Sequence, residues 1–353
     1  MIDILDLTYA ELREFISGDL AEKPFRADQV WQWLWQRGVT SFEAMSNVSG
    51  ELRRHLDAGC FIFRPEMVQR CDSVDGTIKL LLRMSDGELV ETVLIPGEAR
   101  AGERRVTQCL SSQVGCAMGC TFCSTGAMGF TRNLTQSEIL GQVLLGREIL
   151  GDTRKREILR NLVFMGMGEP LLNYRAVMRS LETLSSEAGL NFSRRRITVS
   201  TCGIEQGLLE LGESGLAYLA ISLHAPDQAL RARIMPGAAR WPLEQMLRAL
   251  EGYSLGARER ITFEYLLLGG VNDAPAQALA LARIANRLGA KVNLIAYNPA
   301  AGSPYRAPTP ERLLAFEQEL WKHGVTAILR KSKGQDIDAA CGQLKTACLA
   351  DKA

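Results

Sequence analysis

The chain has 353 residues, 46% of them hydrophobic and 23% charged, with a formal net charge of +1 at pH 7. This composition is ordinary for a globular protein and excludes a disordered chain, and the length allows one barrel-sized domain with a smaller appendage. The near-neutral charge gives no general signal for a nucleic-acid partner, so such a contact would have to come from local basic clusters.

Residues 1–60 show polar and apolar residues alternating at the helical period, which predicts a small N-terminal helical domain. Its amphipathic helices are expected at residues 6–15, 26–35 and 41–55. Trp31, Trp33 and Trp35 are interpreted as the core of this domain rather than as a platform on which bases stack.

Residues 61–102 are predicted to form an antiparallel β meander and a linker, because the period changes to that of strands. Asp75-Gly76 and Asp86-Gly87 are typical hairpin turns. The third strand of the meander carries Glu91 among apolar neighbours. An acid on a strand usually faces solvent, so the pattern alone favours an exposed Glu91.

Residues 103–333 alternate predicted strands and helices, which indicates a parallel sheet flanked by helices. Strands are expected at 106–111, 161–165, 196–200, 219–223, 261–267, 292–296 and 325–329, and helices notably at 135–150, 175–187, 242–253, 274–288 and 310–322. This many units fit an open or partial (β/α) barrel, which reacts at the C-terminal ends of its strands. Residues 334–353 are predicted to be a flexible, polar C-terminal segment.

Two exclusions concern the compartment. No N-terminal stretch reads as a signal peptide, and no run of about 18 apolar residues reads as a membrane span. We therefore expect a cytoplasmic protein without membrane contact. Nine cysteines in a reducing compartment argue against a disulfide scaffold and for metal or redox chemistry at some of them.

Three cysteines, Cys116, Cys120 and Cys123, follow a C-x-x-x-C-x-x-C pattern in a glycine-flanked loop, with no fourth cysteine at ligand spacing. Three thiolates can hold three irons of a [4Fe–4S] cluster and leave the fourth iron open to a substrate. S-adenosylmethionine (SAM) suits that position, because its amino and carboxylate groups can chelate iron while an electron from the cluster breaks a carbon–sulfur bond. A structural zinc site would want four ligands, and buried free cysteines would not need this spacing.

Polar and glycine-rich residues follow several of the predicted strands. Gly166 and Gly168 let the backbone approach a ligand closely, and Glu169 can accept hydrogen bonds from the ammonium group of SAM. The other candidates for a pocket at this end of the barrel are Ser200, Ser222, His224 and Asn298. His224 is predicted either to cap the adenosine of SAM or to satisfy a buried carbonyl.

Two further cysteines lie outside the loop pattern. Cys109 is on the strand that leads into the loop, where it is either a small buried apolar residue or a functional thiol. Cys341 lies in the polar, glycine-flanked stretch 334–344, which favours an exposed, reactive thiol.

Four stretches together resemble the RlmN/Cfr family of radical SAM adenine methyltransferases. They are Ser111 to Cys123, Gly166 to Asn173, Ile221 to Pro226 and Asp336 to Leu344. The resemblance covers nearly the whole chain and implies a partial (β/α)6 barrel with an N-terminal helix-hairpin-helix-like domain. It also implies methylation of adenine C2 in 23S rRNA, at the peptidyl transferase centre, and in tRNA, in the anticodon loop next to the anticodon.

The resemblance implies a role for each matching position. The cluster would be held by Cys116, Cys120 and Cys123. SAM would be surrounded by Gly168, Glu169, Ser200, Ser222, Leu223, His224 and Asn298. Cys341 would carry the methyl group as S-methylcysteine, and Glu91 would accept the proton of the ring. Cys109 would resolve a transient protein–RNA adduct by forming a disulfide bond with Cys341.

The implied partners are 23S rRNA, tRNA and a reducing electron donor such as flavodoxin, and the protein is expected to be a monomer. Local basic clusters at 154–156, 194–196 and 330–333 are the candidates for phosphate contacts, although such clusters often only face water. Two alternatives stay open at this point: a Cfr-type methyltransferase acting at adenine C8, and a non-catalytic iron–sulfur protein that binds RNA.

Overall fold

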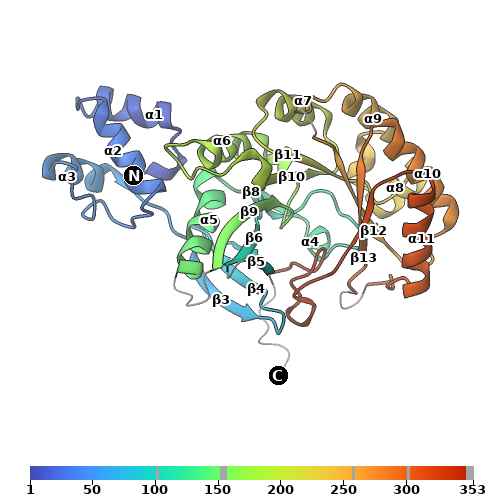
Figure 1. Ribbon diagram of the computed structural model, residues 1–353. Coiled ribbons are helices and arrows are strands. Elements are labelled where there is room, and N and C mark those ends of the chain that lie inside the picture. Colours follow the sequence, from blue (N-terminus) through green and yellow to red (C-terminus); the bar gives the residue numbers. More distant parts are fainter. Residues whose placement is uncertain (101–102, 152–156, 257–258, 300–302, 347–353) are drawn as a thin grey trace.

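The barrel strands define the architecture. The computed structural model describes residues 1–100, 103–151, 157–256, 259–299 and 303–346 (Figure 1). The parallel strands are β6 (Glu103–Cys109), β9 (Glu157–Phe164), β10 (Ile197–Thr201), β11 (Tyr218–Ser222), β12 (Thr262–Leu267), β13 (Lys291–Ala296) and β14 (Ala327–Arg330). Neighbours in this order are paired in parallel, from β6 to β14. The predicted partial barrel is confirmed.

An antiparallel meander extends the same sheet beyond β6. Its strands are β3 (Glu66–Asp72), β4 (Ile78–Arg83) and β5 (Leu89–Arg100). Within the described residues, the full sheet has ten strands in the order β14-β13-β12-β11-β10-β9-β6-β5-β4-β3, so it remains open between β14 and β3. The turns lie at the predicted Asp-Gly pairs, where Gly76 and Gly87 have positive φ.

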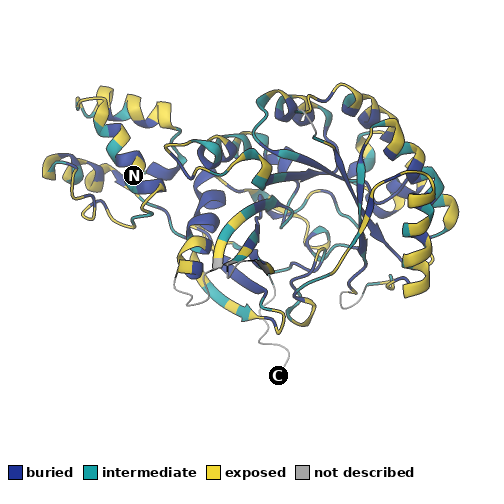
Figure 2. Cartoon of the chain, in the orientation of Figure 1, coloured by how far each residue is buried: buried dark blue, intermediate teal, exposed yellow. Residues whose placement is uncertain are grey.

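Helices form the outer layer of the barrel (Figure 1). They are α5 (Gln136–Gly151), α6 (Tyr174–Ser185), α7 (Glu205–Ser214), α8 (Gln228–Ile234), α9 (Leu243–Glu251), α10 (Pro275–Arg287) and α11 (Pro310–Lys322). In α9, for example, the buried residues are Leu243, Met246, Leu247 and Leu250, one apolar stripe at i, i+3, i+4 and i+7. Figure 2 shows the resulting contrast between buried strands and exposed outer helix faces.

The N-terminal domain packs against α5 and α6 (Figure 1). It contains β1 (Ile2–Asp3), α1 (Tyr9–Glu14), α2 (Phe25–Trp35), α3 (Gly50–Gly59) and β2 (Cys60–Phe61). Gln136 Nε2 of α5 donates to the carbonyl of Leu5 at 2.8 Å, and the amide of Ser137 donates to Asp6 Oδ1 at 2.8 Å. These contacts fix the domain on the barrel.

One expectation for the N-terminal domain was wrong, and a second holds only in part. The third helix begins at Gly50 rather than near residue 41, because the Ser49 side chain caps it by accepting from the amide of Leu52. Trp31 and Trp35 are core residues as predicted. Trp33 is only partly buried, and the guanidinium of Arg37 lies 4.2 Å from its ring.

No bounds for helix α7 were predicted from the sequence, and its glycines explain why. Its sequence contains Gly207 and Gly212, which weaken a helical signal.

In the described part of the chain, no helix is both long and apolar enough to cross a membrane.

Candidate active site

The cysteine loop follows β6 at the C-terminal end of the barrel strands. It lies between β7 (Gln113–Gly115) and β8 (Phe130–Asn133) and includes the short helix α4 (Ser124–Ala127). At Gly115 φ is +71°, and a Cβ would lie 1.9 Å from the carbonyl oxygen of Gly129, so the crossing requires glycine. The amide of Thr121 donates to the carbonyl of Ile234 at 3.0 Å, which holds the loop against the end of α8.

A cavity of about 160 Å³ opens beside this loop. It brings together most of the predicted site: Cys116, Cys120, Cys123, Gly168, Glu169, Ser200, Ser222 and His224. Among the described residues, no three His, Cys, Asp or Glu side chains lie close enough together to bind one metal ion. The three loop thiols instead share the wall of this cavity.

The loop thiols are chemically suited to hold a metal cluster. Burial raises the pKa of Cys116 to about 12, and it raises the pKa of Cys120 well above its ordinary value. The charges of neighbouring thiolates add to the shift of Cys120, so the thiolate form needs a cation beside it. Metal binding supplies that cation and releases the protons.

Glu169 is held rigidly at the cavity wall and is 4% exposed. Its Oε1 accepts from the amide of Leu171 at 3.0 Å, and its Oε2 accepts from the amide of Cys202 at 2.8 Å. Burial raises its pKa, and these hydrogen bonds oppose the shift. Gly168 has φ +101°, and a Cβ there would lie 2.6 Å from Gln113 Cβ. The geometry leaves Glu169 able to accept from a ligand ammonium group.

His224 is a neutral hydrogen-bond donor at this cavity. Its Nδ1 accepts from the amide of Leu266 at 3.0 Å, so Nε2 carries the proton. Burial lowers the pKa of His224 to about 3. The Phe122 ring packs edge-on against the imidazole, with centroids 5.1 Å apart. The His224 imidazole therefore accepts from an amide and does not donate to a buried carbonyl. Its Nε2–H is left to donate to a ligand.

The four other predicted SAM contacts differ in position. Ser200 Oγ and Ser222 Oγ, on neighbouring strands, lie 3.2 Å apart at the cavity. Leu223 is fully buried and is not part of the cavity wall. Asn298 also lies outside this wall, and its Oδ1 accepts from Gln335 Nε2 at 2.5 Å. The structure therefore does not bring Leu223 and Asn298 into the cavity.

The C-terminal segment, residues 334–346, is anchored rather than flexible, which corrects the expectation. The Asp336 carboxylate accepts from Ser73 Oγ at 2.6 Å and from the amide of Val74 at 3.1 Å. Closer to Cys341, the amide of Ser124 donates to the carbonyl of Gly342 at 2.8 Å. The polar residues that suggested mobility are thus the groups that bind the segment to the β3–β4 turn and to α4.

Cys341 is exposed and lines the cavity of the loop cysteines. It also lines an adjoining cavity of about 230 Å³, together with Arg330, Lys331 and Lys333. Burial of the sulfur by this surrounding protein raises the pKa of Cys341, and the charge of Arg330 lowers it. Cys341 is thus exposed, as predicted, and its reactivity stays a prediction.

Cys109 ends β6 behind this cavity and is 8% exposed. Burial raises its pKa to about 12, the charge of Cys341 adds to the shift, and the charge of Arg330 opposes it. Both cysteines are free thiols, so the expected disulfide bond is not formed in this structure. Arg330 Nη1 also lies 3.6 Å from Glu264 Oε2.

Glu91 is 1% exposed, so the expectation of a solvent-facing acid was wrong. Its Oε1 lies 3.1 Å from Lys79 Nζ, and its Oε2 accepts from the amide of Lys345 at 2.8 Å. The C-terminal segment covers this face of the meander, which a strand pattern cannot indicate.

Comparisons with known proteins agree over the whole chain. The model for the ribosomal RNA large subunit methyltransferase N-terminal domain matches residues 2–62, and that for the radical SAM superfamily matches residues 110–282. The dual-specificity RNA methyltransferase RlmN of Nitratidesulfovibrio vulgaris (strain DSM 19637 / Miyazaki F) is 65% identical, over 100% of this chain and 96% of the relative. This chain belongs to the RlmN family of radical SAM RNA methyltransferases.

Two further matches support the assignment to the RlmN family. The protein of the same name from Lawsonia intracellularis is 57% identical over 99% of this chain and 98% of its own. The crystal structure of a radical SAM methyltransferase from Sphaerobacter thermophilus has a TM-score of 0.90 and 40% identity, covering 98% of this chain and 100% of that chain. The chain is therefore an enzyme, which excludes the non-catalytic alternative.

Membership of the RlmN family implies a [4Fe–4S] cluster and SAM as cofactors. The residues present fit both groups, because three thiols, a buried carboxylate and a neutral imidazole donor border one cavity. The cavity residues that sequence reasoning missed are chiefly Met118, Cys202, Met235, Glu264 and Arg330. The signals for two of them were present, since Met118 lies inside the cysteine pattern and Cys202 follows the predicted strand that ends at Ser200.

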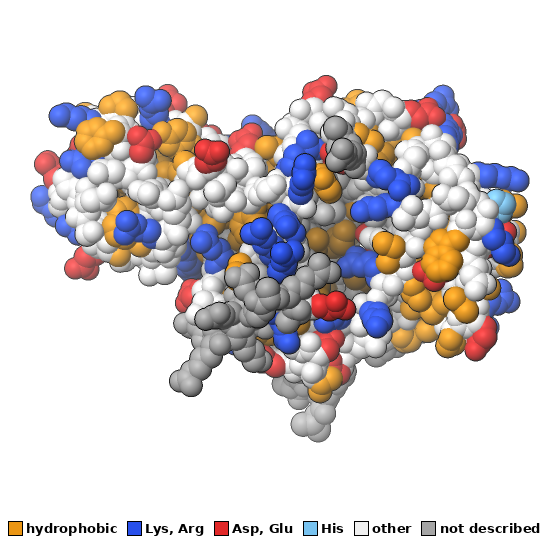
Figure 3. Space-filling view, viewed as in Figure 1, with side chains coloured by type: hydrophobic (Ala, Val, Ile, Leu, Met, Phe, Trp, Pro, Cys, Tyr) orange, Lys and Arg blue, Asp and Glu red, His pale blue; other side chains and the backbone are white. Residues whose placement is uncertain are grey.

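The three basic clusters, predicted as candidates for phosphate contacts, differ in their surroundings. Residues 154–156 lie outside the described residues. In the cluster 194–196, Arg194 is bound to Glu259, whereas Arg195 is exposed. Residues 330–333 line the cavity next to Cys341. On the face shown in Figure 3, Lys and Arg side chains gather near the middle of the molecule.

Proposed function

We propose that this enzyme methylates C2 of a specific adenosine in 23S rRNA, at the peptidyl transferase centre, and in tRNA, next to the anticodon. The names of the close relatives, dual-specificity RNA methyltransferases, support an activity on more than one RNA. The observation that carries the proposal is the position of Cys341, which lines the same cavity as the three loop cysteines.

The cavity residues would hold the cofactors in the following way. Cys116, Cys120 and Cys123 would bind the cluster, and Glu169 would accept from the SAM ammonium group. Ser200 and Ser222 would contact the carboxylate or ribose of SAM, and His224 would donate to its adenosine. When bound, the cluster and SAM supply a carbon radical, which is required because C2 of adenine is too electron-poor to attack a methyl group. Leu223 and Asn298 would act from behind the cavity wall.

Cys341 would carry the methyl group to the RNA. Its thiolate is the competent nucleophile toward the methyl group of one SAM molecule, and the product is a thioether on Cys341. The charge of Arg330 favours the thiolate form. The C-terminal segment fixes the sulfur beside the cavity, so the methyl group on Cys341 would face the bound cofactors.

Glu91 and Cys109 would complete the reaction once the carbon of Cys341 is bonded to the adenine. Glu91 would take the proton from C2, and the ring radical left by the addition would lose one electron to the cluster when it is bound, which restores the aromatic ring. The Cys109 thiolate would attack Sγ of Cys341, breaking its bond to the transferred carbon and forming a disulfide bond. The released carbon takes up one proton and becomes the new methyl group. An external reductant then returns two electrons and two protons to the cysteines.

This chemistry requires an electron donor and a path by which the RNA enters. A reduced flavodoxin or a similar low-potential donor would supply electrons. The flipped adenine would enter through the cavity next to Cys341, where Lys331 and Lys333 can contact phosphates. We further propose a cytoplasmic monomer, as expected from the sequence.

Mass spectrometry of the RNA tests this proposal. Purified enzyme, SAM and reductant are incubated with 23S rRNA fragments and with tRNA, and the nucleosides are compared with 2-methyladenosine and 8-methyladenosine standards. The proposal expects 2-methyladenosine in both RNAs. Only 8-methyladenosine would favour the Cfr-type alternative, and no methylated adenosine in either RNA would contradict the proposal.

A further inference from the structure

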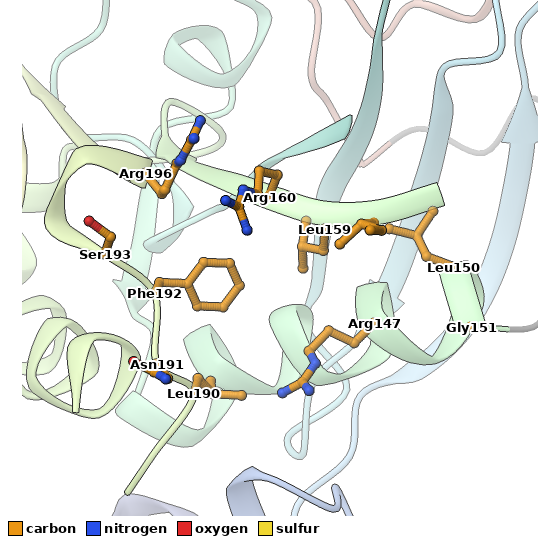
Figure 4. A pocket seen from close by; sticks show the side chains of 11 residues that line it. Arg147, Leu150, Gly151, Leu159, Arg160, Leu190, Asn191, Phe192, Ser193 and Arg196 are labelled. Atoms are coloured by element: carbon orange, nitrogen blue, oxygen red, sulfur yellow. The ribbon is translucent and has the colours of Figure 1, made fainter. Parts of the chain in front are cut away.

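A second large cavity lies at the opposite end of the barrel strands (Figure 4). It has a volume of about 390 Å³ and is lined by the end of α5, the start of β9 and the loop before β10. Strand β9 contributes Leu159 here, whereas Met165, just beyond its other end, lines the cysteine cavity. At about 3.3 Å per residue, these two positions are about 20 Å apart. The cavity is therefore separate from the active site.

Three arginines line this cavity: Arg147, Arg160 and Arg196. Arg147 donates to the carbonyl of Trp35 at 3.3 Å, and Arg196 donates to Asn161 Oδ1 at 3.3 Å. Within the described part of the chain, no carboxylate forms an ion pair with any of the three arginines. Desolvation of the Arg147 guanidinium by the surrounding protein lowers its pKa, so an anion beside it would stabilise the charged form. Among its described lining residues, the cavity thus presents cations without compensating anions.

An aromatic ring lies among these cations. In the view of Figure 4, the Phe192 ring points into the cavity, with Arg160 above it and Arg147 to its right. Leu159 and Leu190 add apolar surface to the same wall. Arginines that contact phosphates, combined with an aromatic face on which a base can rest, are the usual elements of single-stranded RNA sites.

The cavity continues toward the N-terminal domain. Arg147 also lines an adjoining cavity of about 360 Å³, which includes Arg37 and Arg64. Gln36 Nε2 of the N-terminal domain donates at 3.3 Å to the carbonyls of Glu187 and Ala188, just before the cavity loop. Because Arg147 lines both cavities, cationic side chains extend across the domain boundary beside one acid, Glu148, and this extended arrangement suits a chain of phosphates better than a single small anion.

We propose that this cavity is a subsite for one nucleotide of the RNA substrate outside the target adenosine. The backbone phosphate contacts Arg147, Arg160 and Arg196, and the base rests on Phe192. The inference depends on the proposed function, because it requires an RNA substrate. It lies at the opposite end of the barrel strands from the cysteine cavity, so an RNA must pass around the outside of the barrel to reach both sites. The subsite thus distinguishes a complete folded RNA from a short stem-loop.

Binding measurements on charge-neutral variants test the subsite. Arg160→Gln is compared with Arg195→Gln, a matched control because Arg195 is exposed in the same region but does not line the cavity. Dissociation constants are measured by fluorescence anisotropy at several salt concentrations, for full-length tRNA and for a short stem-loop around the target. Arg160→Gln should weaken binding of full-length tRNA about 5- to 10-fold and reduce the salt slope by about one.

Three further results are expected. Arg195→Gln should bind tRNA like the wild type, and no variant should change binding of the short stem-loop. Phe192→Leu should weaken tRNA binding about fivefold or more without changing the salt slope, because it removes stacking and not charge. SAM cleavage and the thermal midpoint should be unchanged in Arg160→Gln, since its side chain is exposed.

Two outcomes would overturn the subsite. Equal tRNA affinities for Arg160→Gln and Arg195→Gln would show that the cavity does not contact RNA. Binding of AMP to the wild type that Arg160→Gln abolishes, with tRNA affinity intact, would identify a free-nucleotide site instead. These failures differ from failure of the proposed function, in which the wild-type enzyme forms no methyladenosine.

Discussion

The carboxylate of Glu91 and the ammonium group of Lys79 form an ion pair of 3.1 Å in which both side chains are almost completely buried. Because Glu91 Oε2 also accepts from the amide of Lys345, the pair lies directly under the C-terminal segment that carries Cys341. Burial raises the pKa of Glu91, and the charge of Lys79 opposes that shift. The proposed proton acceptor, its cation and the methyl-carrying segment thus form one connected unit.

Replacing Lys79 with Met should raise the pKa of Glu91 further, because the opposing charge is lost. Glu91 accepts a proton only when ionised, so the acidic limb of the pH–rate profile for RNA release should move to higher pH. Lys79→Arg keeps the charge and should stay close to the wild type. An unchanged acidic limb in Lys79→Met would separate Glu91 from the proton-transfer step.

The same substitution should destabilise the fold by about 3–5 kcal/mol at neutral pH, because it leaves a buried charge unpaired. Folding raises the pKa of Glu91 above its reference value of 4.5. Protonation of Glu91 therefore stabilises the folded state fully below pH 4.5, and this stabilisation is lost as pH rises through the folded-state pKa. The deficit of Lys79→Met should therefore shrink toward acid pH. Thermal unfolding at two pH values, with Lys79→Arg alongside, measures this difference.

Arg330 should promote methylation of Cys341, because its charge lowers the pKa of that thiol. In Arg330→Gln, less thiolate is present at neutral pH, so Cys341 methylation should slow several-fold and recover at higher pH. Lys331→Gln, at the neighbouring exposed position, is the control. Intact-protein mass spectrometry with SAM gives the rate. A slow rate that does not recover with pH would point to a structural role for Arg330.

Single replacement of Cys116, Cys120 or Cys123 with Ala should abolish SAM cleavage, because two thiolates do not hold a site-differentiated cluster in place. The readouts are the visible absorption of the reconstituted cluster and the yield of 5′-deoxyadenosine. Cys71→Ala, outside the cavity, should behave like the wild type. A triple variant that keeps both the absorption band and 5′-deoxyadenosine formation would refute the assignment of these ligands.

The barrel and the cysteine loop could be predicted from sequence because each depends on local pattern. Strand–helix alternation predicted β6 and β9 to β14 with small shifts of their ends. The spacing of Cys116, Cys120 and Cys123 predicted a shared site, because residues of one short loop remain close together in any fold.

The errors arose where distant segments meet. Glu91 looked solvent-facing because nothing in its strand indicates that residues 334–346 cover it. The C-terminal segment looked flexible because its polar residues have partners about 260 positions away, such as Ser73 for Asp336. The sequence placed Arg330 only in a candidate basic cluster for phosphates and did not indicate that its charge also acts on Cys341 and Cys109. Pairings over such separations leave no periodic signal in one sequence.

Asp336→Ala should loosen the C-terminal segment, because it removes two hydrogen bonds to the turn between β3 and β4. Methylation of Cys341 should then slow about 10-fold or more as the sulfur leaves its position, while SAM cleavage persists. Asp72→Ala, an exposed acid at the end of β3 with no bond to the segment, is the control. Equal methylation rates in the two variants would show that the anchor does not position Cys341.

We propose above all that Cys341 carries the methyl group and that Cys109 releases the RNA. The most direct measurement is intact-mass analysis of purified Cys109→Ala, with and without nuclease. We expect a nuclease-sensitive protein–RNA adduct in Cys109→Ala and none in Cys341→Ala. Cys60→Ala, which also truncates a buried cysteine at a cost of about 1 kcal/mol, should turn over normally. A Cys109→Ala enzyme that is free of RNA and fully active would contradict the account.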